Sequence, residues 1–213
     1  MIKAIIFDCW DTLFGNEIEK THPFQIFAEK IGKSLQDYTY LKIFEKHFML
    51  EKHYRLEVPI KELLDELHIK HTNKLIDELK GILEAALHSQ KSFPETLKVL
   101  NELRKNYKLG LISNTFYQSF EGLEEKFKVN EIFDAILKSY ETKMLKPDPK
   151  IFEIMIKRLK VNKDEALMVG DSLKDDVESA ENFGIKGILI DRKGKHPEYP
   201  NRITSLEQVK KFL

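Results

Sequence analysis

Cysteine is nearly absent from this chain of 213 residues, which contains only Cys9. A single thiol excludes an internal disulfide and is typical of proteins in a reducing compartment. The chain also lacks net charge, since 35 lysines and arginines balance 35 aspartates and glutamates. Without a basic stripe or a polybasic segment, we expect no binding to nucleic acid or to an anionic membrane.

Long hydrophobic runs are missing as well. No segment approaches the ~20 apolar residues that a membrane-spanning helix needs. The apolar run at 4–7 is too short for a signal peptide and stops at an acid. We therefore expect a cytoplasmic protein. Apolar residues make up 42% of the chain, which is enough for one large domain or for a core with a smaller insert.

Five apolar segments predict buried parallel strands. They are AIIF (4–7), LGLIS (109–113), DAILKS (134–139), ALMVG (166–170) and GILID (187–191). Helical periodicity lies between them, at 95–107 and 149–159. This alternation predicts an α/β fold, with a doubly wound, Rossmann-like parallel sheet and right-handed crossovers.

The segment from about residue 15 to 91 breaks this alternation. Apolar residues recur there at helical spacing, around 24–31, 41–48 and 75–83. Breaks between helices are expected at Val58-Pro59 and at His71-Thr72-Asn73. No strand pattern is visible in this segment. The sequence therefore predicts an α/β core of residues 1–14 and 92–213 with an all-helical insert at 15–91.

The residues at or after the ends of four predicted strands could take part in binding an anion. Asp8 follows the first strand, Ser113 and Asn114 close the second, and Asp171 follows the strand at 166–170. Lys146 lies in the loop of KPDPKIF. Because ligands of open α/β sheets bind at the carboxyl ends of the strands, these groups are expected to converge.

Helix-start signals place two of these groups in loops. Asp148 suits an N-cap and Pro149 suits the first helical position, which leaves Lys146 in the preceding loop. Ser172 and Asp175 have the spacing of a weak capping box. Asp175 is therefore expected to be a helix-start residue, whereas Asp171 precedes the cap.

Several carboxylates and one lysine at one point predict a divalent cation with an anionic ligand. Asp8 and Asp171 offer the oxygen ligands that Mg²⁺ prefers. The cation and Lys146 would offset the repulsion between an acidic nucleophile and an anionic substrate. The seven histidines, in contrast, show no metal-ligand spacing.

Four segments, DCWDT, LISN, MLKPDPKIF and VGDSLKDDVESA, resemble the four ordered motifs of the haloacid dehalogenase-like hydrolase superfamily. The resemblance covers residues 1–14 and about 92–213. The helical insert falls, by position, where this family carries its first type of cap domain. Agreement of all four motifs in order is far more specific than any one of them.

The resemblance implies a role for each matching residue. Asp8 would be the nucleophile and would form a covalent aspartyl-phosphate. Thr12 would hydrogen-bond around the nucleophile loop, and Ser113, with Asn114 beside it, would bind a phosphoryl oxygen. Lys146 would neutralise charge on Asp8 and on the transferring group.

The resemblance also implies a set of Mg²⁺ ligands. These would be Asp8, the backbone carbonyl of Trp10, Asp171, and Asp176 either directly or through water.

Trp10 departs from the family pattern. Most phosphatases of this family have an aspartate at that position, two residues after the nucleophile, which acts as general acid and then as general base. Tryptophan cannot carry protons, so a contribution of typically about 10²–10⁴-fold is missing unless another group supplies it. Asp11 stands at the next position, where glycine is usual. It could reach into the site or serve as a plain turn residue.

Three functions are consistent with this sequence. The first is a Mg²⁺-dependent phosphatase of small phosphorylated molecules with good leaving groups. The second is a metal-independent 2-haloacid dehalogenase, a branch that also carries an aromatic residue at the position of Trp10. That branch expects an arginine early in the cap, but the first here is Arg55, and a tyrosine where this chain has Phe152. The third is a weakly active protein that binds a phosphorylated ligand or a protein partner. The sequence does not select the substrate, the cap residues that recognise it, or the oligomeric state.

Overall fold

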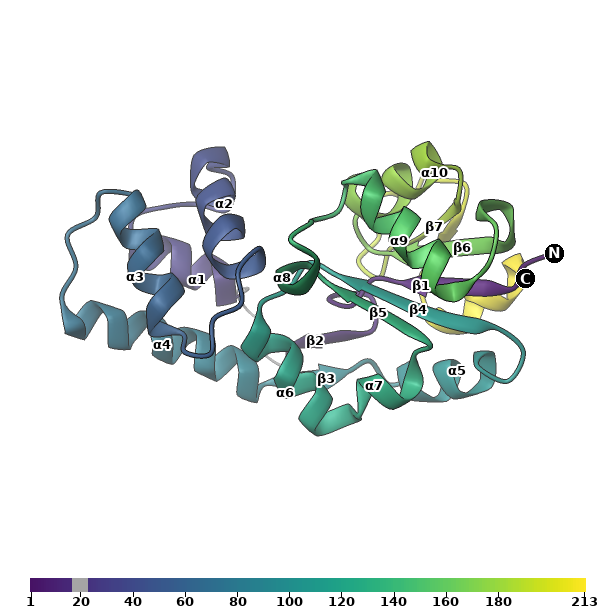
Figure 1. Cartoon of the computed structure of the whole chain (residues 1–213), viewed down its shortest axis with the longest axis horizontal. Coiled ribbons are helices and arrows are strands. Elements are labelled where there is room, and N and C mark those ends of the chain that lie inside the picture. Colours follow the sequence, from purple (N-terminus) through teal and green to yellow (C-terminus); the bar gives the residue numbers. More distant parts are fainter. Residues whose placement is uncertain (17–22) are drawn as a thin grey trace.

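The computed structural model describes residues 1–16 and 23–213. The part of the predicted helical insert at 17–22 lies outside the described residues. Figure 1 shows an α/β body, which contains both termini, and a group of helices, which lies at the opposite end of the molecule. The long helix α4 (Asn73–His88) leads from that group back towards the α/β body.

A six-stranded sheet with the order β5-β4-β1-β6-β7-β8 forms the α/β body, and every neighbouring pair in it is parallel. Its strands are β1 (Ala4–Phe7), β4 (Lys108–Ser113), β5 (Ala135–Lys138), β6 (Ala166–Gly170), β7 (Lys186–Ile190) and β8 (Arg202–Ile203). The five predicted strands are therefore confirmed, and β1 and β6 have the predicted bounds. The sequence missed β8 because two residues are too few to show a strand pattern.

Strand β1 lies between β4 and β6, with Ile5 opposite both Leu109 and Leu167. All four of its side chains are buried, which explains the uninterrupted apolar run. Alternate residues point to opposite faces of the sheet, so Ile5 and Phe7 join one core cluster and Ala4 and Ile6 join another. The residue that follows β1 is therefore placed at the middle of the carboxyl edge.

Helices cover both faces of the sheet. One face, with the cluster that contains Ile5 and Phe7, is covered by α5 (Thr96–Leu103), α6 (Tyr117–Phe127), α7 (Val129–Ile132), α8 (Ser139–Thr142) and the 3₁₀-helix η4 (Leu206–Phe212). The opposite face is covered by α9 (Pro149–Leu159) and α10 (Ser179–Phe183). Two short helices, η2 (Lys163–Glu165) and the π-helix η3 (Leu173–Glu178), flank β6. This arrangement confirms the predicted doubly wound fold.

The group of helices has a core of its own. The group consists of α1 (Pro23–Lys30), α2 (Tyr38–Phe44), the π-helix η1 (Glu45–Met49), α3 (Glu57–Glu66) and α4. Phe44 stacks on Phe48 with ring centroids 4.4 Å apart, and Phe27 meets both rings edge-on. Phe116, which precedes α6, also packs in this cluster and so connects the helices to the α/β body.

One of the two predicted helix breaks is wrong. The break at His71-Thr72-Asn73 is confirmed, since the Thr72 side chain caps α4 by accepting from the Leu75 N–H. The predicted break at Val58-Pro59 instead lies inside the first turn of α3. Proline is tolerated there because the first N–H groups of a helix have no intrahelical partner.

The prediction that the insert contains no strand is also wrong. β2 (Phe14–Asn16) and β3 (Gln90–Ser92) form an antiparallel ribbon, with Gly15 opposite Lys91. The ribbon lies where the chain leaves the α/β body and where it returns. Strands of three residues, here Phe-Gly-Asn and Gln-Lys-Ser, are too short to show alternation.

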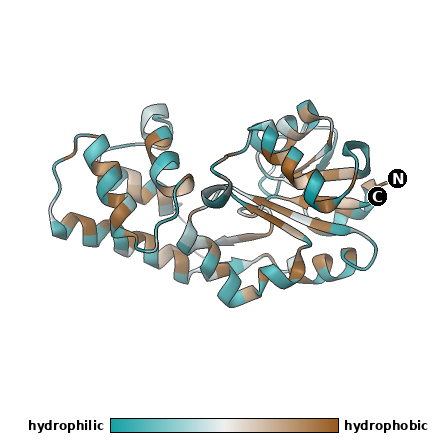
Figure 2. Cartoon of the chain, in the orientation of Figure 1, coloured by the Kyte–Doolittle hydropathy of each residue, from teal (hydrophilic) through white to brown (hydrophobic). Residues whose placement is uncertain are grey.

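Figure 2 shows apolar residues concentrated along the strands, and apolar and polar residues alternating along the helices, as expected for amphipathic helices. Among the helices of residues 1–16 and 23–213, none is both long enough and apolar enough to cross a membrane.

The close approach of η3 and α10 to β7 depends on Gly187. A Cβ at this position would lie 2.7 Å from Val177 Cγ1 and 3.0 Å from the Val177 carbonyl oxygen. We expect Gly187→Ala to push η3 from the sheet and to lower the free energy of unfolding by about 1–3 kcal/mol. Urea unfolding would measure this loss.

Gly81 on α4 provides a matched control. It is exposed, and a Cβ there meets no atom of the described residues within 4 Å. Gly81→Ala is therefore expected to raise the free energy of unfolding by about 0.5–1 kcal/mol, because alanine favours helix. Shifts of the same sign in both variants would contradict this account of the packing.

Candidate active site

Three charged side chains meet at the carboxyl edge of the sheet. Asp8 directly follows β1, and its N–H still donates to the Val169 carbonyl of β6 at 2.9 Å. Lys146 comes from the loop before α9, and Asp176 comes from η3. Lys146 Nζ lies 2.5 Å from both Asp8 Oδ1 and Asp176 Oδ1. All three residues are buried, so the structure shows the predicted convergence of Asp8 and Lys146.

Lys146 is charged in this environment. Burial alone would lower the pKa of its ammonium group, but the carboxylates of Asp176 and Asp8 outweigh that effect and raise the pKa above its usual value. The raised pKa favours the charged ammonium form of Lys146 beside Asp8.

Asn114 holds the backbone of Lys146 in place. Its Nδ2 donates to the Lys146 carbonyl at 3.1 Å, and its Oδ1 accepts from the Lys146 N–H at 2.9 Å. The sequence predicted Asn114 as a substrate ligand, but both ends of its amide are used in this contact. The geometry therefore favours a role in positioning Lys146.

Three carboxylates lie close enough to share a cation. One oxygen each from Asp8, Asp171 and Asp176 lies within 4.8 Å of the others. Burial and the neighbouring Asp8 raise the pKa of Asp171 to about 8. Burial raises the pKa of Asp176 to about 6, against the opposing effect of Lys146. A hard divalent cation such as Mg²⁺ fits these oxygen donors and would relieve their mutual repulsion.

Gly170, the last residue of β6, makes room for Asp176. A Cβ on Gly170 would clash with the Asp176 carboxylate. Asp176 Oδ2 accepts from the Ser172 N–H at 3.0 Å, and the Ser172 side chain caps η3 by accepting from the Asp175 N–H at 3.1 Å. Asp175 is therefore a helix-start residue, as predicted. No sequence pattern indicates the steric role of Gly170.

Ser113 lies at the end of β4 and is fully buried. Its hydroxyl neighbours the Cys9 thiol, whose pKa is raised by burial. Ser113 Oγ has no hydrogen bond of normal geometry within the described residues. The Cys9 sulfur is a weak acceptor for this hydroxyl. The phosphoryl contact of Ser113 stays a prediction.

A hydrogen bond holds the side chain of Trp10 in place. Its indole N–H donates to Thr115 Oγ1 at 3.2 Å. Thr115 in turn is tied to Ser139, which accepts from its N–H at 3.0 Å and donates to its carbonyl at 2.9 Å. Sequence reasoning missed both Thr115 and Ser139, because neither hydroxyl carries a motif signal.

Asp11 adopts the left-handed conformation with φ 54°, and its N–H donates to the Phe14 carbonyl at 2.7 Å. Its side chain is exposed. These features support the interpretation of Asp11 as a turn residue. In the same loop, the Thr12 hydroxyl lies 3.5 Å from Asp171 Oδ1, which is a long contact.

Arg192, just after β7, is a residue that the sequence did not single out. Its guanidinium donates to the Thr12 carbonyl at 2.9 Å and to Glu95 Oε1 at 2.7 Å, and it stacks 3.7 Å from the centroid of the Phe93 ring. Arg192 thus ties the loop that follows Asp8 to Glu95 and Phe93. A lone arginine after a strand has no sequence signature.

Comparisons with known proteins show which proteins this chain resembles. The family model of haloacid dehalogenase-like hydrolases matches residues 2–184. A glyceraldehyde 3-phosphate phosphatase from Methanothermobacter thermautotrophicus is 29% identical, over 89% of this chain and 86% of that protein. An (S)-2-haloacid dehalogenase 4A from Burkholderia cepacia is also 29% identical, over 57% of this chain and 52% of that protein.

Solved structures show the same fold. The crystal structure of a HAD phosphatase from Thermococcus onnurineus has a TM-score of 0.67 and 25% sequence identity, and the match covers 99% of this chain and 97% of that one.

The buried ion pairs give a prediction about stability. Lys146→Met leaves Asp8 and Asp176 without their counter-charge, so we expect a loss of about 3–5 kcal/mol in the free energy of unfolding. Urea unfolding in the presence of EDTA would measure it without compensation by bound cations.

A double-mutant cycle tests the cause of that loss. In the Asp8→Asn background one of the two carboxylates is already neutral, so Lys146→Met should cost less there, by about 0.5–3 kcal/mol. Equal costs in both backgrounds would show that Lys146 stabilises the fold by packing rather than by charge.

Proposed function

Because the chain belongs to the haloacid dehalogenase-like hydrolases, we propose that it is a Mg²⁺-dependent phosphatase of small phosphorylated molecules. The observation that carries this proposal is the buried Lys146 ammonium group between Asp8 and Asp176, beside the carboxylate of Asp171. The similarity to a glyceraldehyde 3-phosphate phosphatase over most of both chains supports the phosphoryl chemistry.

Asp8 is the proposed nucleophile. Its Oδ1 is bound by Lys146, which leaves Oδ2 to attack the phosphorus atom. The bond from phosphorus to the leaving oxygen breaks as the aspartyl-phosphate forms. Water then attacks the same phosphorus atom, which releases phosphate and regenerates the Asp8 carboxylate. Lys146 neutralises charge in both steps, and Asn114 keeps its backbone in place.

The donor set fits Mg²⁺. Asp8, Asp171 and the Trp10 carbonyl would hold it, and Asp176 would assist through water because its oxygens already accept from Lys146 and Ser172. When bound, the cation supplies charge neutralisation for the transferring phosphoryl group.

The insert at 15–91 is the proposed cap over this site, with the β2–β3 ribbon as its connection to the core of residues 1–14 and 92–213. Its loop 50–56 contacts the core through its backbone carbonyls. Gln118 Nε2 donates to the His53 carbonyl at 2.8 Å, and Lys143 Nζ donates to the Leu50 carbonyl at 2.6 Å. Side chains of this insert would select the substrate.

Trp10 restricts the substrates. Without a general acid at this position, the leaving oxygen departs as an anion, so aryl and acyl phosphates should react faster than alkyl phosphates.

A 2-haloacid dehalogenase is the second candidate, and Trp10 is the observation that favours it. Phe152 counts against it, because the phenyl ring is fully buried on α9 in the core cluster of Ala4 and Ile6. A side chain in that place cannot take the role of the tyrosine that the dehalogenase branch carries.

Hydrolysis of para-nitrophenyl phosphate tests the proposed function, because its leaving group needs no protonation. We expect turnover that requires Mg²⁺, stops with EDTA, and is abolished by Asp8→Asn. Absence of turnover in wild type would overturn the phosphatase proposal. Release of halide from 2-chloropropionate would then support the dehalogenase, and absence of both reactions would favour a ligand-binding protein.

Substitution of Trp10 tests the missing general acid. Trp10→Asp should raise the turnover of an alkyl phosphate such as glycerol phosphate by up to about 10²-fold, and that of para-nitrophenyl phosphate much less. Asparagine has the same size as aspartate but no acidic group, so Trp10→Asn is the matched control. An equal gain in both variants would show that the effect comes from removal of the indole.

A further inference from the structure

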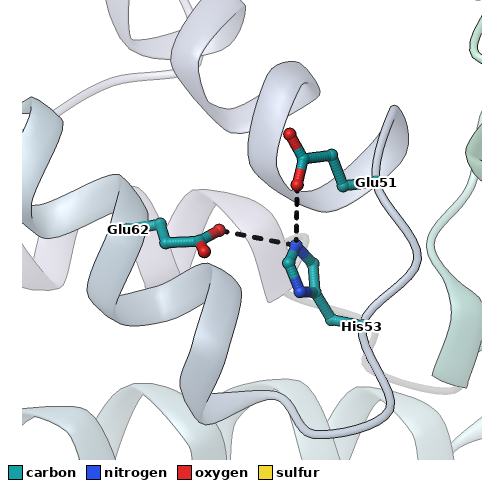
Figure 3. A group of neighbouring side chains, drawn as sticks. All are labelled: Glu51, His53 and Glu62. Carbon is teal, nitrogen blue, oxygen red and sulfur yellow. Dashed lines mark ion pairs between the residues drawn. The ribbon is translucent and has the colours of Figure 1, made fainter.

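The helical group contains a second cluster of potential metal ligands, although the histidine spacing gave no sign of it. Glu51 and His53 lie in the loop between η1 and α3, and Glu62 lies on α3. In Figure 3 the carboxylates of Glu51 and Glu62 point towards one ring nitrogen of His53. His53 Nε2 lies 3.4 Å from Glu62 Oε2 and 3.6 Å from Glu51 Oε2.

These separations suit metal ligands better than hydrogen bonds. N–H···O bonds in proteins measure about 2.7–3.2 Å. Neighbouring ligands of a tetrahedral Zn²⁺ ion, with bonds of about 2.0–2.2 Å, are roughly 3.3–3.5 Å apart. His53 Nε2 is buried and has no hydrogen-bond partner among residues 1–16 and 23–213. This imidazole nitrogen faces two carboxylate oxygens at separations that a shared cation would bridge.

His47 fixes the geometry of this cluster. Its Nδ1 lies 3.2 Å from the same Glu62 oxygen, and its Nε2 lies 2.7 Å from Glu66 Oε2. Lys46 Nζ also binds Glu66 Oε2, at 2.6 Å. These contacts orient Glu62 and balance the charge of Glu66, as partners outside the coordination sphere do at metal sites.

We propose that Glu51, His53 and Glu62 bind a divalent transition-metal cation such as Zn²⁺, with water completing the coordination. Imidazole and carboxylate are ligands that Zn²⁺ accepts. Glu51 is exposed and gives the ion a route from solvent. The bound cation ties the loop 50–56 to α3, and this is the loop whose backbone contacts Gln118 and Lys143 of the α/β body. The site is distinct from the carboxylate cluster of Asp8.

Titration of the full chain with Zn²⁺ alone as the probe, by calorimetry in the presence of excess Mg²⁺, tests this proposal. We expect one tight Zn²⁺ site in wild type, and Asp171→Asn should keep it because the site does not involve the sheet edge. His53→Gln should weaken the binding by about 100-fold or more.

His71→Gln is the matched control. His71 belongs to the same helical group and pairs with Asp65 at 3.0 Å, outside the cluster. This variant should bind Zn²⁺ like wild type. Because His53 is partly buried, Glu51→Gln at the exposed ligand provides a second test that leaves the packing intact, and it too should weaken binding. Absence of saturable Zn²⁺ binding in wild type would overturn the proposal, as would binding unchanged in Glu51→Gln.

Discussion

The contact of the Lys146 ammonium group with Asp8 and Asp176 is the interaction on which the rest of the active site depends. Three acids from β1 and from the segment after β6 converge at one edge because the parallel sheet places β1 between β4 and β6. Without a cation the repulsion between these carboxylates would oppose folding. Asn114 holds the backbone of Lys146, and Gly170 leaves space for the side chain of Asp176. Two neutral residues therefore support this arrangement of charges.

The site contains charged residues that could stabilise a phosphoryl group, but Trp10 cannot transfer protons. The residues proposed to neutralise a transferring phosphoryl group are all present, whereas Trp10, at the position that carries the general acid in most phosphatases of the family, holds an indole bound to Thr115. Asp11 lies in a turn with its side chain exposed, which makes it a poor replacement. On this account the chain retains covalent catalysis by Asp8 and depends on its substrate for an easy departure of the leaving group.

Features that depend on neighbouring residues in the chain could be predicted from the sequence, whereas contacts between residues far apart in the chain could not. The apolar runs of β1 and β6 predicted both strands correctly because burial on two faces leaves no ambiguity. The ribbon β2–β3 was missed because its strands have three residues each. The positioning of Lys146 by Asn114, the clamp of Arg192 on Thr12 and the meeting of His53 with Glu62 join residues that only the tertiary fold brings together.

The most direct test of the central claim is to trap the covalent intermediate on Asp8. A missing general base should slow hydrolysis of the aspartyl-phosphate, whereas its formation from para-nitrophenyl phosphate needs no general acid, so the intermediate should accumulate during turnover. Acid quenching during hydrolysis of para-nitrophenyl phosphate with Mg²⁺, followed by peptide mass spectrometry, would reveal it. The account predicts one phosphoryl group on the peptide that contains Asp8, absent in Asp8→Asn. Continued turnover with no phosphoryl group on that peptide, or with one on another residue, would contradict it.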